Sequence, residues 1–210
     1  MNSHVIMRPL AKAILCGALL ASLSGCVGLM LGGAVAGAAA TFDRRTLGAQ
    51  ADDQSISVKA DLRLPKVAGA DSHVNATSYN RQVLLTGEVI DQAAKAAVER
   101  EAKTINGVLS VSNELTIGNP ATYTARSNDA LITGKVKASL VDMKTISAGS
   151  FKVVTDKTVV YLMGRVTQRE GQVAADVARS VNGVSKVVKM FEYITEDELR
   201  ALSPRSKVQL

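Results

Sequence analysis

An internal duplication constrains this chain more than any other feature of its sequence. Residues 160–166 (VYLMGRV) are a second copy of residues 83–89 (VLLTGEV), with a glycine at the fifth position of each copy. Self-similarity of this kind indicates that one structural unit has been repeated. The part of the chain after residue 50 is therefore expected to fold as two related domains of roughly 65 residues each.

The match extends to both sides of this heptapeptide. Upstream, Asp53, Ile56, Ala60 and Leu64 recur with the same spacing as Asp129, Ile132, Val136 and Leu140. Downstream, residues 105–108 (INGV) recur as residues 181–184 (VNGV), at the same offset as the upstream match. The two heptapeptides are separated by one position more than the matches on either side of them. The second copy therefore has one extra residue before its strands and one fewer residue in the following helix. Small insertions at junctions are expected of two diverged copies of one fold.

Each copy has the periodicities of a mixed α+β unit. Asp53 offers an N-cap for a helix whose apolar residues recur every fourth position, and Pro65 is expected to end it. Alternating apolar residues around a turn at residues 79–81 predict a hairpin, and Gly87 marks a bulge or a close backbone approach. A second helix over residues 91–106 ends at Asn106-Gly107, and a third strand follows. The expected fold class is α+β, with order helix-strand-strand-helix-strand and a three-stranded mixed sheet covered by two helices on one face.

The N-terminus has the pattern of a secretory signal. Two basic residues, Arg8 and Lys12, precede a short apolar core at residues 13–22. A stretch this short, with these flanks, is typical of a cleaved signal peptide rather than a spanning helix. The core ends in residues 23–26 (LSGC), which resemble the lipobox of bacterial lipoproteins. The lipobox resemblance implies that Cys26 becomes residue one and carries a covalent diacylglycerol and an N-acyl lipid.

Two other interpretations of this region are a plain signal peptide and a membrane helix continuing through residues 27–40. Glycine makes such a helix costly, at about 1 kcal/mol per residue relative to alanine. The segment is better interpreted as an apolar tether. Since Cys16 leaves with the signal, the mature chain has one cysteine and no disulfide. By the sorting rule of lipoproteins, Val27 after the cysteine implies transfer to the outer membrane.

The expected domain organisation follows from these signals: 1–25 lipoprotein signal peptide, 26–51 lipid-anchored flexible tether, 52–118 first domain, 119–127 linker, 128–195 second domain, and 196–210 C-terminal tail. The linker is short, so the two domains are expected to touch. Val58 and Leu62 lie on the side of the first helix that faces away from the core of their own domain, and we predict that they form the interdomain contact. Burying each would contribute roughly 1.5 to 3 kcal/mol. The alternative is that both are simply exposed apolar residues, which are common.

The composition argues against catalysis and against nucleic-acid binding. Cleavage of the signal lowers the net charge from +6 by two, and the sequence has no Trp and only three Phe and four Tyr. This is too weak a positive charge, with too few aromatic residues, for a base-stacking surface. His4 lies in the signal and His73 stands alone, so no metal site is expected. Asp52 and Asp53 look like a carboxylate pair, but helix capping explains them.

The Asp-x2-Ile helix, the glycine-centred strand and the Asn-Gly-Val helix exit together resemble the BON domain (bacterial osmotically induced protein and nodulation). The resemblance covers about residues 41–195. It implies a non-catalytic lipoprotein on the periplasmic face of the outer membrane, with a role in envelope integrity and cell division. It also implies binding to an anionic phospholipid membrane, mainly through the second domain, with no cofactor, nucleic acid or small-molecule substrate. One departure from the family pattern is Leu131, where an aromatic residue would anchor more strongly at a membrane interface.

The candidate lipid site is the outer face of the first helix of the second domain. With Ile132, Val136 and Leu140 turned toward the core, a helical rotation of 100° per residue predicts an opposite face that is apolar and flanked by lysine. Its members are Leu131, Gly134, Lys135, Lys137, Ala138 and Val141. Such a stripe suits an anionic headgroup layer. The alternatives are that the stripe packs on the first domain or on a protein partner, which would make the chain a periplasmic scaffold or a regulator of envelope enzymes or outer-membrane assembly machinery.

Overall fold

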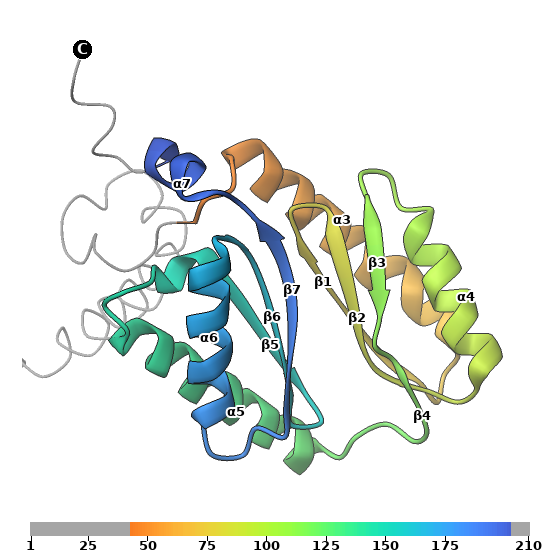
Figure 1. The fold of residues 1–210 in the computed structure, drawn as a ribbon. Helices are drawn as coiled ribbons and strands as arrows, with labels where there is room; N and C mark the ends of the chain where they lie inside the picture. Colours follow the sequence, from red (N-terminus) through yellow and green to blue (C-terminus); the bar gives the residue numbers. More distant parts are fainter. Residues whose placement is uncertain (1–42, 203–210) are drawn as a thin grey trace, which may run out of the picture. The chain divides into compact units, whose positions relative to one another are not determined.

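The computed structural model describes residues 43–202, which belong to one unit of the chain (Figure 1). The predicted signal peptide, Cys26, the tether up to residue 42 and the tail beyond residue 202 lie outside the described residues. The duplication is evident in the order of the elements. The first copy consists of α3 (Leu47–Ala68), β1 (His73–Tyr79), β2 (Gln82–Val89), α4 (Gln92–Lys103), β3 (Ser110–Asn113) and β4 (Thr116–Ile117).

The second copy repeats this order. It consists of α5 (Tyr123–Asp142), the short 3-10 helix η1 (Ala148–Ser150), β5 (Phe151–Asp156), β6 (Val159–Val166), α6 (Gln168–Ser180) and β7 (Lys186–Tyr193), and α7 (Glu196–Leu202) follows. The predicted α+β class and the helix-strand-strand-helix-strand order are confirmed. Helix α7 lies within residues 196–210, the segment that was predicted to be the C-terminal tail.

Both sheets are mixed, as predicted. In the first copy β2 is central, antiparallel to β1 and parallel to β3 and β4. In the second copy β6 is central, antiparallel to β5 and parallel to β7. The third strand of the first copy, predicted as one strand after the second helix, is divided into β3 and β4. It is interrupted at residues 114–115, because Leu115 turns into the core while Glu114 keeps a backbone hydrogen bond to Leu85.

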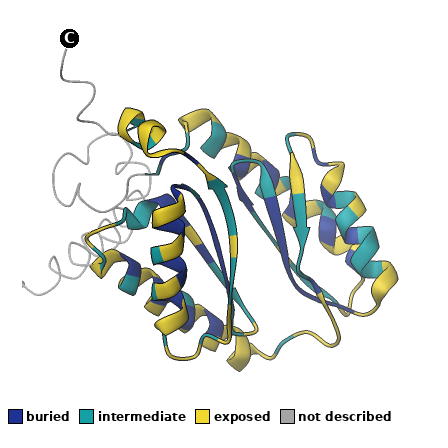
Figure 2. Ribbon diagram, viewed as in Figure 1, coloured by how far each residue is buried: buried dark blue, intermediate teal, exposed yellow. Residues whose placement is uncertain are grey.

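Each copy has its own core between its helices and one face of its sheet (Figure 2). The predicted inward residues of the first helix of each copy are all buried: Ile56, Ala60 and Leu64, and Ile132, Val136 and Leu140. The central glycines also behave as predicted. A Cβ on Gly87 would lie 2.0 Å from the His73 carbonyl oxygen, and one on Gly164 would lie 2.6 Å from the Ser150 carbonyl oxygen. The close backbone approach therefore excludes any side chain there.

The prediction that Asp53 is an N-cap is wrong. Helix α3 already begins at Leu47, and the side chain of Thr46 caps it by accepting a hydrogen bond from the Ala49 N–H. Helix α5 likewise begins well before Asp129, with Thr122 as its cap. The prediction that Pro65 ends the first helix is also wrong. The helix continues to Ala68, which is packed in the core, and this burial offsets the missing backbone hydrogen bond.

Asp53 and Asp129 instead hold the two hairpin turns. Asp53 is buried and accepts hydrogen bonds from the backbone N–H groups of Asn80 and Arg81, both at 2.7 Å. Asp129 accepts from the N–H groups of Lys157 and Thr158, both at 2.9 Å. These four turn residues all have positive φ, which non-glycine residues rarely adopt. A carboxylate from the neighbouring helix thus stabilises a turn for which the local sequence has no glycine.

Candidate functional site

The outward face of α5 is the candidate membrane-binding surface. Its six predicted members, Leu131, Gly134, Lys135, Lys137, Ala138 and Val141, are all exposed. Leu131 is 64% exposed and Val141 is 57% exposed, while Ile132, Val136 and Leu140 on the opposite side are almost fully buried. The division into an inward and an outward face is therefore as predicted, and whether the outward face binds lipid stays a prediction.

The structure adds Tyr123 to this face. Helix α5 begins at Tyr123, so this residue is helical, and it is 81% exposed. From Tyr123 to Val141 the helix makes a whole number of turns at about 3.6 residues per turn, so the two side chains are in line along it. Sequence reasoning missed Tyr123 because it placed the helix start at Asp129. The signal that could have identified it is Thr122, a good N-cap residue, directly before it.

The corresponding face of α3 is also exposed. Val58 is 47% exposed and Leu62 is 63% exposed. The prediction that these two residues form the interdomain contact is therefore wrong. The contact between the domains is made instead by the faces of the two sheets that point away from the helices.

Side chains of these sheet faces form a separate apolar cluster between the domains. Tyr79 and Leu84 come from the first sheet, and Tyr161 and Met163 come from the second. All four are buried, and Val154, Val159, Val188 and Met190 pack around them. Burial raises the pKa of Tyr161 to about 12, and the nearby carboxylates of Glu114 and Asp156 act in the same direction. The expectation that the domains touch is confirmed, although through a different surface.

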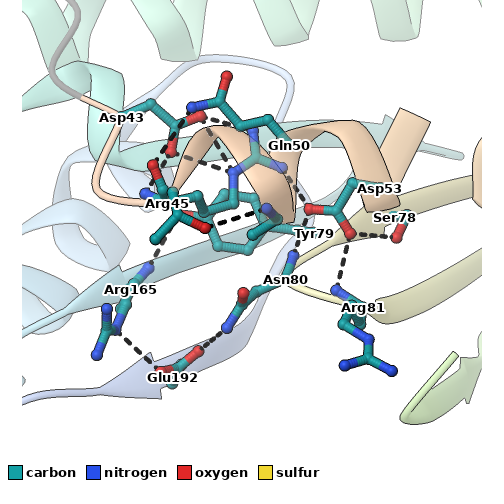
Figure 3. A network of polar contacts seen from close by, with 12 residues as sticks. Asp43, Arg45, Gln50, Asp53, Ser78, Tyr79, Asn80, Arg81, Arg165 and Glu192 are labelled. Carbon is teal, nitrogen blue, oxygen red and sulfur yellow. Dashed lines mark hydrogen bonds and ion pairs between the residues drawn. The ribbon is translucent and has the colours of Figure 1, made fainter. Parts of the chain in front are cut away.

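A polar network borders this cluster (Figure 3). The Tyr79 hydroxyl accepts a hydrogen bond from the Arg165 N–H at 3.2 Å, and the guanidinium of Arg45 lies 4.3 Å above the Tyr79 ring. Arg165 forms an ion pair with Glu192, which also accepts a hydrogen bond from the side-chain amide of Asn80. The hairpin turn of the first domain is thereby linked to the last strand of the second.

Arg45 connects this network to Asp53 (Figure 3). Its guanidinium donates to Asp53 at 2.6 Å and to Asp43 at 2.6 Å. Burial acts to raise the pKa of Asp53, but hydrogen bonds from Ser78, from Arg45 and from the turn N–H groups outweigh it and hold the pKa below its usual value. The carboxylate is therefore an ionised structural acceptor and has no feature of a general acid.

Arg44 attaches the start of the described chain to the second domain. Its guanidinium makes two hydrogen bonds of 2.7 Å to the carboxylate of Glu170, and both side chains are buried. It also donates to the Arg165 carbonyl at 3.1 Å. The prediction that the flexible tether extends to residue 51 is thus wrong for residues 43–51. No spacing rule in the sequence could have revealed this pair, because its partners lie in different domains, far apart along the chain.

The remaining features of the described chain concern metal-ligating side chains, His73 and membrane-spanning helices. Within residues 43–202, no group of three or more His, Cys, Asp or Glu side chains is placed to hold a metal ion. His73 lies at the edge of β1, where its ring nitrogen contacts the side chains of Asn75 and Arg126. Over the same residues, no helix is both long and apolar enough to cross a membrane.

Comparison with known proteins identifies the repeated unit. The model of the BON domain family matches residues 52–119 and 128–195. The chain is 38% identical to the outer membrane lipoprotein DolP of Haemophilus influenzae, over 90% of this chain and 98% of that protein. It is 31% identical to a 21 kDa hemolysin of Actinobacillus pleuropneumoniae, over 72% of this chain and 79% of that protein. It is 29% identical to osmotically-inducible protein Y of Escherichia coli, over 65% and 70% respectively.

Proposed function

Because this chain belongs to the family of tandem BON-domain outer-membrane lipoproteins, we propose that it is a non-catalytic protein that binds anionic phospholipid through α5 of its second domain. In this proposal Cys26 carries the lipid anchor and the folded domains lie on the periplasmic face of the outer membrane. The binding supports the integrity of the envelope, including at the division site.

The observation that carries the proposal is the exposed face of α5. A solvated helix face is expected to be polar, yet this one places Leu131 and Val141 in water together with small residues and Tyr123. Lys135 and Lys137 flank it, and each lysine near an anionic surface adds about 1 kcal/mol. An apolar centre with lysine at its sides and an aromatic residue at one end suits a helix lying in a headgroup layer.

The attachment of the chain start to the second domain supports the same geometry. Arg44 is held by Glu170, and the segment that joins it to Cys26 is short. At about 3.5 Å per residue such a segment spans at most about 60 Å. An anchor on Cys26 would keep the second domain within that distance of the membrane surface, so that weak contacts by α5 act at a high local concentration.

The test is a titration of the two-domain fragment 41–210 with anionic and zwitterionic micelles, following backbone amide shifts. Shifts centred on α5 with the anionic micelles are expected, and Leu131→Glu together with Lys135→Glu should abolish them. Leu62→Glu on α3 is the matched control, because Leu62 is as exposed as Leu131. Shifts centred elsewhere, or shifts that survive the α5 substitutions, would rule out this helix as the site.

The anchor is tested separately. Cys26→Ala should give an unprocessed or mislocalised protein, because the lipobox resemblance makes this residue the acceptor of the diacylglycerol. Fractionation of membranes in cells producing the variant gives the answer. A Cys26→Ala protein that is fully processed and found in the outer membrane would refute the assignment.

A second candidate function is a periplasmic scaffold or regulator of envelope enzymes or of outer-membrane assembly machinery. The exposed Val58 and Leu62 on α3 favour it, since both stay accessible and Asp61, at the position of Lys137, reduces the positive charge beside them. Crosslinking in cells from a photoreactive residue at position 62 would test this function. Capture of one defined envelope protein supports it, and crosslinks to lipid alone argue against it.

A further inference from the structure

The second domain has an apolar groove beside the exposed face of α5. It lies between the last turns of α5, the short helix η1 and strand β5, and its volume is about 220 Å³. Its floor is formed by Leu140, Phe151 and Val153, which belong to the core of the domain. Among the described residues that line it, only Lys137 is charged. The groove therefore opens the domain core to the surface where the apolar stripe ends.

The two copies differ at this edge because their first helices end at different positions. In the first domain, α3 continues to Ala68, which is 2% exposed and packed in the core. Helix α5 stops at Asp142, and the residue that corresponds to Ala68 is Lys144, which lies in the following loop and is exposed. The last turn that covers the core edge in the first domain is thus missing in the second. In addition, Asp61 of the first copy corresponds to Lys137 on the rim of the groove.

We propose that this groove binds part of one acyl chain of an anionic phospholipid, with the phosphate beside Lys137. The inference rests on the proposed function of α5 and adds to it a site for a single lipid molecule. Val141 belongs both to the exposed stripe and to the groove, so a lipid met by the stripe lies next to the opening. The exposed Lys144 adds positive charge at the same end of the helix.

The size and chemistry of the groove fit a hydrocarbon chain. At about 30 Å³ per group, as for a water molecule in the liquid, 220 Å³ holds roughly seven methylene-sized groups. A methylene chain needs no hydrogen-bond partners, which suits a lining of leucine, valine and phenylalanine side chains. Each methylene that enters should strengthen binding about fourfold. The remainder of the chain would stay in the membrane.

The experiment uses the absence of tryptophan from this sequence. Full-length protein carrying Phe151→Trp is reconstituted in vesicles of phosphatidylcholine with phosphatidylglycerol that is brominated on its acyl chains. Bromine quenches the fluorescence of a tryptophan that it contacts. The Phe151 ring packs edge-on against Phe191 with ring centroids 5.8 Å apart, so a tryptophan can keep an aromatic contact there. Leu131→Trp, in a second protein, reports contact of the outer stripe with lipid.

We expect quenching of both reporters. Ala148→Leu fills the groove with about three methylene equivalents, so it should weaken occupancy roughly 50-fold and remove the quenching at Phe151→Trp alone. Ala148→Ser, which leaves the groove open, is the control. As a measurement free of tryptophan substitutions, native mass spectrometry of the otherwise unchanged protein should show one retained phosphatidylglycerol that Ala148→Leu removes and Ala148→Ser keeps.

The outcomes separate the groove from the proposed function. Quenching at Leu131→Trp without quenching at Phe151→Trp, and no retained lipid, overturns the groove and leaves the α5 surface intact. The same result is expected if the chain's own apolar residues 27–40 occupy the groove. Quenching at neither position refutes both inferences. Quenching at Phe151→Trp that survives Ala148→Leu also overturns the proposal, since lipid would then reach the tryptophan by another route.

Discussion

Asp53 is the residue whose substitution most sharply tests how this fold is held together. The carboxylate is 4% exposed and accepts four hydrogen bonds: from Ser78 Oγ at 2.6 Å, from the N–H groups of Asn80 and Arg81 at 2.7 Å, and from Arg45 Nη1 at 2.6 Å. Asn80 and Arg81 have φ of 47° and 68°. Asp53→Ala would leave these donors unsatisfied and the strained turn unsupported.

The expected loss is about 4 kcal/mol of unfolding free energy. Each hydrogen bond to a charged group contributes about 1.5 to 3 kcal/mol, but the four share one acceptor and are not additive. Breaking a buried charge pair by removing one partner costs about 3 to 5 kcal/mol. A loss of this size is a large part of the roughly 5 to 15 kcal/mol that stabilises a typical domain.

The assay is urea unfolding of the fragment 41–210, followed by circular dichroism. Asp53→Ser separates the two possible roles, because serine is as good an N-cap as aspartate but is too short to reach the turn. The neighbouring Asp52→Asn is the control, since Asp52 is exposed and should change stability by less than about 0.5 kcal/mol. A loss of only about 1 kcal/mol in Asp53→Ala, with normal stability in Asp53→Ser, would refute the turn-holding role.

The pH dependence gives a second check on Asp53. The pKa of Asp53 in the folded protein is lowered from 3.8. Its contribution to the unfolding free energy is therefore fully present above pH 3.8 and is lost as the pH falls through the pKa of the folded protein. The difference between the parent and Asp53→Ala should therefore be constant from pH 7 to pH 5 and shrink only in stronger acid. A difference that disappears near pH 6 would contradict this assignment.

Three further predictions concern single contacts. Gly87→Ala should destabilise the first domain by more than about 3 kcal/mol in urea unfolding, because the new Cβ would lie 2.0 Å from a backbone oxygen. Gly134→Ala lies on open helix surface and should instead stabilise the protein by up to about 1 kcal/mol. Glu170→Gln should cost about 3 kcal/mol by leaving the buried charge of Arg44 without a counter-charge, and adding Arg44→Ala should recover part of the loss. Burial and the neighbouring Glu88 and Asp129 raise the pKa of Asp156 above 3.8, so its charge opposes folding at higher pH. Asp156→Asn should therefore unfold at a higher urea concentration than the parent protein at pH 7, and its unfolding free energy should depend less on pH.

The local architecture could be predicted from the sequence alone. The apolar periods of the helices and hairpins lie within short windows, and the duplication showed every period twice, so the order of elements and the inward residues were found. The outward face of α5 was found by the same argument, because a helix with a buried side must have an opposite side. Helix starts were misplaced, since Asp53 and Asp129 have the residue type of caps but serve a hairpin turn much further along the chain.

Tertiary structure decided how the copies meet and where the chain begins its fold. The sheet faces that pack together carry Tyr79 and Tyr161, whose alternation in a strand shows only that they point away from the domain core. The Arg44–Glu170 pair and the groove at Phe151 join residues that no periodic pattern relates. A side chain's neighbours within one element follow from repeat geometry, whereas its neighbours across elements depend on which apolar faces are left to be buried once each domain has formed.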